Sequence, residues 1–127
     1  MKNFTITVIH ASFLEDGEQP RAVAKVTTRG LDLFAATEYA YRYTNNLDGS
    51  WSMKLGEDAN DDVEVIAPLI SHKGKTYGLR STSVGDVMIV DDGEGFTDWF
   101  KVAGFGFEPC DAIDYETVDA TQAEVLA

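Results

Sequence analysis

Two neighbouring segments near the start of the chain alternate apolar and polar residues, and the segment after them does not. Residues 4–8 and residues 21–28 both show this period of two, which is typical of half-buried β-strands. The connection between them contains acidic residues together with Gly17 and Pro20, which favour a turn. The sequence therefore predicts a pair of antiparallel strands at the beginning of the fold.

After the second strand the hydrophobic period changes to that of a helix. Apolar residues now recur at steps of three and four, which places them in one stripe: Leu33, Ala36, Ala40, Tyr43 and Leu47. Asp32 precedes this stripe, where a negative charge suits the positive end of the helix dipole. Asn and Gly residues follow it, so we expect one principal helix over about residues 31–46.

The remaining segments up to residue 108 favour strands. Residues 63–70 are the third strand candidate, and Pro68 near its end argues for an edge position. Residues 87–90 are continuously apolar, as expected of a strand buried on both faces. An acidic loop then leads into residues 97–107, a returning strand whose two glycines permit a bulge.

This order of elements predicts the α+β class, with one main helix packed on a small, mainly antiparallel and barrel-like sheet. Strands and helix do not alternate as they do in folds built from βαβ units. A chain of 127 residues with 44% hydrophobic residues is long enough to bury one core. We expect a single domain over residues 1–108 and an acidic C-terminal segment over residues 109–127.

Composition also favours a soluble protein of the cytoplasm. No apolar run approaches the roughly 20 residues needed to cross a bilayer. The first residues alternate in polarity where a signal peptide would be continuously apolar. Cys110 is the only cysteine, which excludes a disulfide within the chain, and no histidine or basic residue stands near it to activate its thiol.

Nearly all of the excess negative charge lies in the last third of the chain. The net charge is −12: residues 1–85 carry 11 acidic and 9 basic side chains, whereas residues 86–127 carry 11 acidic residues and only Lys101. This asymmetry repels nucleic acid and anionic membranes and attracts basic protein surfaces. We expect one continuous partner-binding acidic face made by a hairpin loop and the C-terminal segment: Asp91, Asp92, Glu94, Asp98, Asp111, Asp114, Glu116 and Asp119. Three apolar residues of that segment are expected to pack on the domain: Ile113, Tyr115 and Val118.

Patterns for catalysis or metal binding do not fit this chain. The acidic stretches at residues 58–62 and 91–94 lack the glycine and glutamate spacing of a calcium-binding EF-hand loop. His10 continues the apolar side of the first strand and is interpreted as a hydrogen-bonded core histidine, while His72 lies in a polar turn. No serine stands in a G-x-S-x-G motif. The sequence predicts a protein that is not an enzyme and holds no metal or cofactor.

Six aromatic residues offer two interpretations, a platform on which bases stack or packing in the core: Trp51, Phe96, Trp99, Phe100, Phe105 and Phe107. Stacking platforms come with basic grooves, and this region is acidic, so core packing is favoured. Lys73, Lys75 and Arg80 lie within eight positions and would form a local basic patch. They keep a nucleic-acid-binding, β-barrel-like domain open as the alternative function.

The segment "RSTSVGDVMIV", residues 80–90, has the most particular pattern in the chain. A Gly-Asp step that opens an apolar strand is common in small β-barrels, because Gly85 can adopt a backbone conformation closed to other residues and Asp86 can cap the turn. We therefore expect Arg80, Ser83, Gly85 and Asp86 to form a structural motif.

A helix ending in "YAYRYTNNLDGSW", followed by that segment and by a closing "FKVAGFGFEP", resembles a set of small proteins encoded by bacteriophages and plasmids. In that set a helix with a Thr-Asn ending and a Trp precede an Arg-Ser-x-Ser-Val-Gly-Asp strand, and a short Gly-Phe or Gly-Trp strand ends the domain. The resemblance covers residues 30–108 and carries no assigned activity. Together with the acidic face, it implies a phage-encoded accessory protein that binds a host protein in the bacterial cytoplasm, as an inhibitor or as a mimic of DNA.

Overall fold

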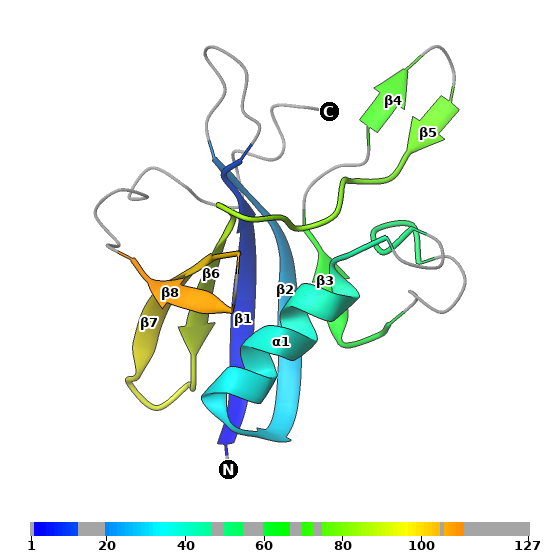
Figure 1. The fold of residues 1–127 in the computed structure, drawn as a ribbon. Helices are drawn as coiled ribbons and strands as arrows, with labels where there is room; N and C mark the ends of the chain where they lie inside the picture. The colour runs from blue at the N-terminus through cyan, green and yellow to red at the C-terminus, as the bar shows by residue number, and fades with distance from the viewer. Residues whose placement is uncertain are drawn as a thin grey trace.

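One helix packed on a six-stranded antiparallel sheet makes up the described part of the protein (Figure 1). The computed structural model describes these residues: 2–12, 20–46, 50–54, 60–66, 70–72, 75–104 and 106–110. The elements have the following bounds: β1 Lys2–His10, β2 Arg21–Leu31, α1 Leu33–Tyr43, β3 Val63–Val65, β4 Ile70–His72, β5 Lys75–Tyr77, β6 Val87–Asp91, β7 Thr97–Val102 and β8 Phe107–Pro109. The strand order in the main sheet is β3-β2-β1-β6-β7-β8, while β4 and β5 pair with each other. The predicted α+β class is confirmed.

The first two strands pair antiparallel, as their alternating residues predict. Ile6 lies opposite Val26 and Val8 lies opposite Ala24, and all four side chains are buried. Ile9, the next residue after Val8, points to the other face of the sheet by the normal alternation of a strand. Both of these neighbours are therefore buried, each in a different hydrophobic cluster.

The helix begins where its sequence predicts but ends earlier than residue 46. The Asp32 carboxylate caps it by accepting a 2.8 Å hydrogen bond from the Ala35 N–H. At the other end the Thr44 hydroxyl donates to the Ala40 carbonyl at 2.7 Å, and the Asn45 side-chain amide donates to the Tyr41 carbonyl. These side chains occupy the carbonyls that helix continuation would use. With 11 residues in α1, no helix among the described residues is long and apolar enough to cross a membrane.

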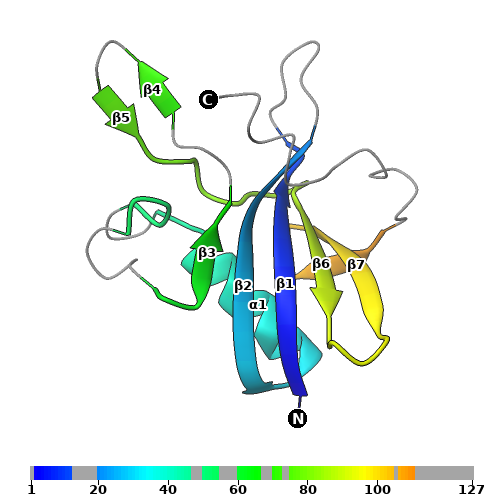
Figure 2. The same ribbon diagram turned by 180° about the vertical axis from the view of Figure 1, so that it is seen from behind.

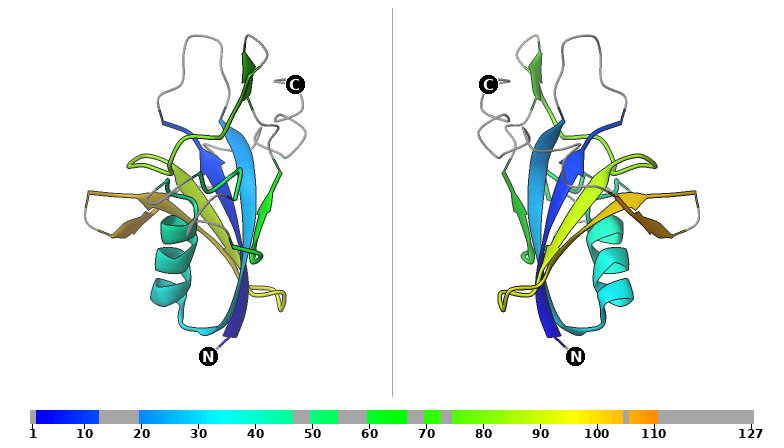
Figure 3. Two further views of the ribbon diagram at one scale, coloured as in Figure 1. Left: turned by 90° about the vertical axis from the view of Figure 1, so that its right-hand side faces the viewer. Right: turned by 90° about the vertical axis from the view of Figure 1, so that its left-hand side faces the viewer.

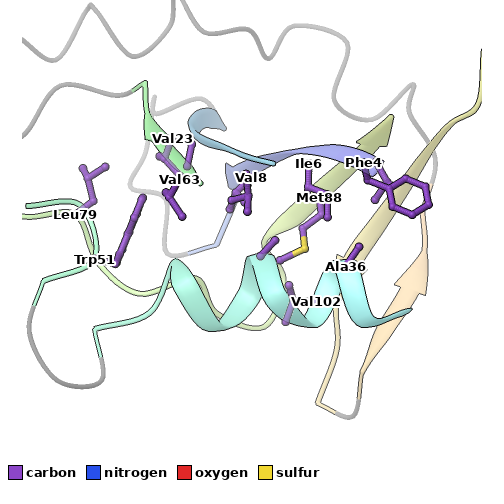
Figure 4. Packing of buried hydrophobic residues seen from close by; sticks show 14 residues of the cluster. Phe4, Ile6, Val8, Val23, Ala36, Trp51, Val63, Leu79, Met88 and Val102 are labelled. Carbon is purple, nitrogen blue, oxygen red and sulfur yellow. The ribbon is translucent and has the colours of Figure 1, made fainter. Parts of the chain in front are cut away.

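The larger hydrophobic cluster lies between α1 and one face of the sheet (Figure 4). Ala36 and Ala40 are fully buried, and their small side chains let the helix approach β1 and β2 closely. Met88 fills the space between the helix and the sheet, and Trp51 and Leu79 close the cluster near β3 (Figure 4). The core therefore depends on residues from strands, helix and loops together.

Strand β6 is buried on both faces, as its continuous apolar run predicts. Met88 and Val90 join the cluster under the helix. Val87 joins Ile9 and Ala22 in the smaller cluster, on the opposite face of the sheet. Figure 2 shows the sheet from the side away from the helix, with α1 behind β1 and β2. β6 sits between β1 and β7 in the middle of the sheet, which explains why it needs apolar residues at successive positions.

Two predicted strands are shorter than expected. The strand predicted over residues 63–70 is confirmed only as β3, an edge strand paired with β2; residues 67–69 lie outside the described residues. The returning strand predicted over residues 97–107 is divided into β7 and β8. A turn joins them, in which the Ala103 N–H donates to the Gly106 carbonyl at 3.0 Å and Gly106 has a φ of 73°. These glycines serve a turn and not a bulge.

The expectation of a barrel-like sheet is wrong, because the sheet is open. Its two edges are β3 and β8, each only three residues long, and α1 lies on the face that closure would turn inward. Pro109 in β8 has no N–H to offer to a further strand. The sheet instead curls toward the helix at its β7–β8 end (Figure 3).

Candidate functional site

The carboxylate of Asp86 is the centre of the most connected polar cluster in the described residues. Its side chain is fully buried, with 0% exposed. Its Oδ1 atom accepts hydrogen bonds from the Ala11 N–H at 2.8 Å and the Ser12 N–H at 2.9 Å. Its Oδ2 atom accepts one from the Ser83 N–H at 2.8 Å. Both atoms also accept from the Arg80 guanidinium, at 2.8 and 2.6 Å. We call this the Asp86 network.

Arg80 also donates hydrogen bonds to two backbone carbonyls. Its Nη2 atom donates to the Ser12 carbonyl at 3.0 Å and its Nη1 atom to the Ser81 carbonyl at 2.8 Å. Burial alone would raise the pKa of Asp86, but the hydrogen bonds from Arg80, the positive charge that His10 gains when it is protonated at low pH, and the backbone N–H groups outweigh it and hold this pKa below its ordinary value. Asp86 and Arg80 therefore form a charged pair at neutral pH, with Arg80 the more exposed partner.

His10 extends the network toward the end of the helix. Its Nε2 atom lies 3.1 Å from the Thr82 hydroxyl, which donates to the Thr44 hydroxyl at 2.8 Å, which in turn donates to the Ala40 carbonyl. A carbonyl can only accept, so each hydroxyl proton points toward Ala40 and the Nε2 atom of His10 must carry a proton. Burial lowers the pKa of His10 to about 4, partly offset by Asp86 and reinforced by Arg80. His10 is therefore neutral at pH 7.

The prediction that His10 is a hydrogen-bonded core residue is confirmed. A Thr–His contact resembles half of a nucleophilic centre, but Thr82 is 1% exposed and its proton is directed to Thr44. No substrate reaches that oxygen. The hydrogen bonds of the network join the end of β1, the segment before β6 and the end of α1.

Gly85 has the backbone conformation that the Gly-Asp step predicts. Its φ is +93°, and a Cβ atom there would lie 2.2 Å from the Ser12 hydroxyl oxygen. That hydroxyl donates to the Val84 carbonyl at 2.6 Å. The predicted local hydrogen bond of Asp86 is confirmed in the contact with Ser83. The sequence did not indicate the contacts with Ala11 and Ser12, because more than 70 positions separate them from Asp86.

The acidic hairpin loop between β6 and β7 is shaped by its own carboxylates. Asp91 accepts a 2.7 Å hydrogen bond from the Gly93 N–H. Asp92 accepts from the N–H groups of Glu94 at 2.7 Å and Phe96 at 3.0 Å. These bonds define the shape of the loop, in which Asp91 and Glu94 are exposed to solvent.

Of the residues predicted to form the acidic face, four lie on the described hairpin of β6 and β7: Asp91, Asp92, Glu94 and Asp98. Asp98 lies on β7, half-buried, opposite Val90. The other predicted members lie outside the described residues: Asp111, Asp114, Glu116 and Asp119. The same holds for the apolar residues expected to dock beside them: Ile113, Tyr115 and Val118.

The aromatic residues are mostly parts of the core. Trp51 is 1% exposed and donates its indole N–H to the Arg80 carbonyl at 2.8 Å. Phe100 and Phe107 pack against the larger cluster and Trp99 against the smaller one. The packing interpretation is confirmed for these four residues, whereas Phe96 is 40% exposed and Phe105 lies outside the described residues.

Of the three residues predicted to form a basic patch, Arg80 is engaged elsewhere in the structure. Arg80 is bound to the buried Asp86 and is not available to a phosphate. Lys73 lies outside the described residues, and Lys75 belongs to β5. Across the described ranges, no group of three or more His, Cys, Asp and Glu residues is arranged to hold a metal ion.

Searches against protein-family models, curated proteins and solved structures found no match to this chain.

Proposed function

We propose that this chain is an accessory protein, encoded by a bacteriophage or plasmid, that binds a protein of the bacterial host through its acidic side and performs no catalysis. The charge distribution carries the proposal, since residues 86–127 hold 11 acidic residues against one lysine. An excess of this size in one segment draws a basic partner surface into contact and orients it.

The hairpin loop supports the proposal through its internal hydrogen bonds. Hydrogen bonds from three backbone N–H groups to Asp91 and Asp92 shape the loop before any partner arrives. A partner that binds an already ordered loop loses less free energy to side-chain and backbone ordering. The exposed Glu94 at the tip is then positioned to meet a cation.

A narrower form of the proposal is DNA mimicry. In it, the carboxylates of the hairpin and of the C-terminal segment take the place of phosphates and occupy a DNA-binding host protein. Competition by duplex DNA for the captured partner distinguishes this form from ordinary charge pairing, because a mimic and DNA cannot bind the same site together.

The test compares two double charge reversals of equal size. Glu94→Lys with Glu116→Lys alters the proposed face, and Asp61→Lys with Glu64→Lys alters exposed positions near β3, at the other edge of the sheet. Each tagged variant is used to capture proteins from bacterial lysate at about 0.1 M and 0.5 M salt, since the Debye length falls from roughly 10 Å to less than half of that.

We expect a partner that is captured at low salt by the native chain and by the Asp61/Glu64 variant, and lost with the Glu94/Glu116 variant. If both variants retain every salt-sensitive partner, or both lose it equally, the acidic side only keeps the protein soluble and the proposal is wrong.

A further inference from the structure

The helix leaves the β7–β8 end of the sheet partly uncovered, and three adjoining depressions lie there. The largest has a volume of about 240 Å³. A second, of about 130 Å³, shares Leu33 with it, and a third, also of about 130 Å³, shares Phe107. The shared lining residues place the three depressions side by side, and we treat them together as one groove. We call it the apolar groove and define it by Leu33, Phe34, Thr37, Phe96, Phe100 and Phe107.

The helix presents a second stripe of residues to this groove. Leu33, Ala36 and Ala40 face the core, whereas Phe34, Thr37 and Tyr41 line the groove at steps of three and four. From Leu33 to Tyr41 the helix rises about 12 Å, so the groove follows roughly two helical turns.

Two large apolar side chains at the groove remain exposed in the isolated protein. Phe34 is 62% exposed and Phe96 is 40% exposed. A single exposed apolar residue is ordinary, but these two lie along the same groove as Phe100 and Phe107. Covering apolar area is favourable by about 25 cal/mol per Å², so a partner that fills the groove gains affinity from these rings.

The charged residues of the groove all have the same sign. Among the described residues that line the three depressions, Glu38 and Asp92 are the charged ones. Asp98 shares the face of Phe100, because Val90 and Met88 lie opposite these two residues and both belong to the cluster under the helix. The apolar floor therefore has an acidic rim, which is complementary to a basic segment.

This charge argues against two occupants supplied by the chain itself. A second copy carries a net charge of −12 and the same acidic rim. The C-terminal residues 111–127 contain five acidic residues and no basic one. Like charges brought together at a rim are destabilising.

We propose that the apolar groove binds an amphipathic helix of the partner whose apolar stripe is flanked by lysine and arginine. The proposal rests on the proposed function, because the partner is a protein with a basic surface. The groove is lined mainly by side chains, so binding depends on apolar anchors in one stripe. A helix supplies such a stripe at positions i, i+3, i+4 and i+7 while its backbone hydrogen bonds are satisfied internally.

The probes are synthetic 16-residue peptides with Leu, Phe or Met in the apolar stripe and Lys on the flanks. Each has a control of the same composition in scrambled order and a second control with Glu for Lys. Binding is measured by fluorescence anisotropy, and helix formation by circular dichroism. We expect at least one basic amphipathic peptide to bind and to become helical, and neither control to bind.

The variants have matched controls in the chain. Phe34→Ala should weaken binding by about tenfold, whereas Val84→Ala, at another exposed apolar residue that does not line the groove, should leave it unchanged. Glu38→Lys should weaken binding by about fivefold at low salt, and Glu64→Lys should have less effect. Because Phe34 is mostly exposed, its variant should melt like the native protein.

Three results would overturn the proposal. The first is that no basic amphipathic peptide binds, or that binding does not depend on Phe34. The second is a concentration-dependent dimer in sedimentation that Phe34→Ala abolishes, which would make a second copy the occupant. The third is peptide binding that appears only after deletion of residues 111–127, which would make that segment the occupant.

The result also separates this proposal from the proposed function. If a captured host protein depends on Glu94 and Glu116 but not on Phe34, the acidic side binds the partner and the groove does not. If peptides bind through Phe34 while host capture is unaffected by Glu94 and Glu116, the acidic side is not the host-binding surface.

Discussion

At the scale of single residues, Asp86 joins two parts of the chain that are distant in sequence. Its carboxylate joins the end of β1, the segment before β6 and the Arg80 side chain. A buried carboxylate is stable only when its acceptor sites are filled, and here five hydrogen bonds from four residues fill them. The positive φ of Gly85 turns the backbone so that the Asp86 side chain can reach these donors.

Asp86→Asn should lower the free energy of unfolding by about 3 kcal/mol, because it leaves the Arg80 cation without its counter-charge and turns an amide donor toward other donors. Urea unfolding at pH 7 measures the change. Asp98→Asn, at a half-buried carboxylate on β7, is the control and should cost less than about 0.5 kcal/mol. Equal losses in both variants would show that the Asp86 network contributes nothing special.

Gly85→Ala should cost on the order of 1 kcal/mol or more, since the new methyl group would be strained at a φ of +93° and would displace the Ser12 hydroxyl. Gly104→Ala is the control, because no atom lies within 4 Å of its added Cβ and its φ is not positive. Thermal unfolding compares the two. An unchanged melting temperature in Gly85→Ala would contradict the expected strain.

The stability should depend on pH through His10. In the folded protein the His10 ring takes up its second proton, and so becomes charged, only near its lowered pKa of about 4. In the unfolded chain it does so near the ordinary pKa of 6.5. The free energy of unfolding should therefore fall as the pH drops through this window, by about 2 kcal/mol between pH 7 and pH 5. Asp86 does not contribute there, because its lowered pKa affects stability only below its unfolded value of 3.8.

Urea unfolding at both pH values tests this dependence in two variants. His10→Gln should flatten it, and His72→Gln should leave it as in the native protein. A native protein equally stable at pH 7 and pH 5 would contradict the buried, neutral state of His10.

At the scale of elements, α1 is held by its cap and by its contact with the sheet. Its 11 residues are too few for a helix that is stable alone in water. The Asp32 cap fixes its start, and the buried Ala36 and Ala40 fix its distance from β1 and β2. Its remaining flank, with Phe34 and Tyr41, is the wall of the apolar groove.

Asp32→Ala should lower the free energy of unfolding by about 1 kcal/mol, because the Ala35 N–H loses its acceptor. Asp61→Ala, at an exposed aspartate outside the helix, is the control and should be close to neutral. Circular dichroism during urea unfolding measures both. A cap that contributes nothing would give the two variants the same midpoint.

At the scale of the whole molecule, charge and apolar surface are unevenly distributed. The acidic residues concentrate after position 85, while the exposed phenylalanines gather between α1 and β7–β8. The two features adjoin at the β6–β7 loop, where Asp92 and Phe96 line the same depression. Both features underlie the proposal of a basic, partly apolar partner.

The net charge of −12 should make the fold sensitive to salt. Raising the salt concentration from about 0.02 M to 0.15 M should raise the melting temperature by about 3 °C, because it screens repulsion among exposed carboxylates. The Asp61/Glu64 double reversal carries less net charge and should show a smaller rise. A melting temperature that falls with salt would mean that attractive ion pairs outweigh this repulsion.

Local patterns in the chain were enough to predict the strand pair, the helix, the buried β6 and the special backbone of Gly85. Alternation, helical spacing and the demand for positive φ act within a few residues, so they can be recognised without the rest of the fold. The helix end was predicted too late because hydroxyl and amide side chains of Thr44 and Asn45 compete for the last carbonyls.

Contacts between distant segments decided the rest. The open sheet follows from three-residue edges and from a helix that occupies one face, neither of which any single segment encodes. Asp86 meets Ala11 and Ser12 only because β1 and β6 are neighbours in the sheet. The apolar groove likewise exists only where α1 stops covering β7 and β8, since it is the packing of these elements that leaves Phe34 exposed beside Phe100 and Phe107.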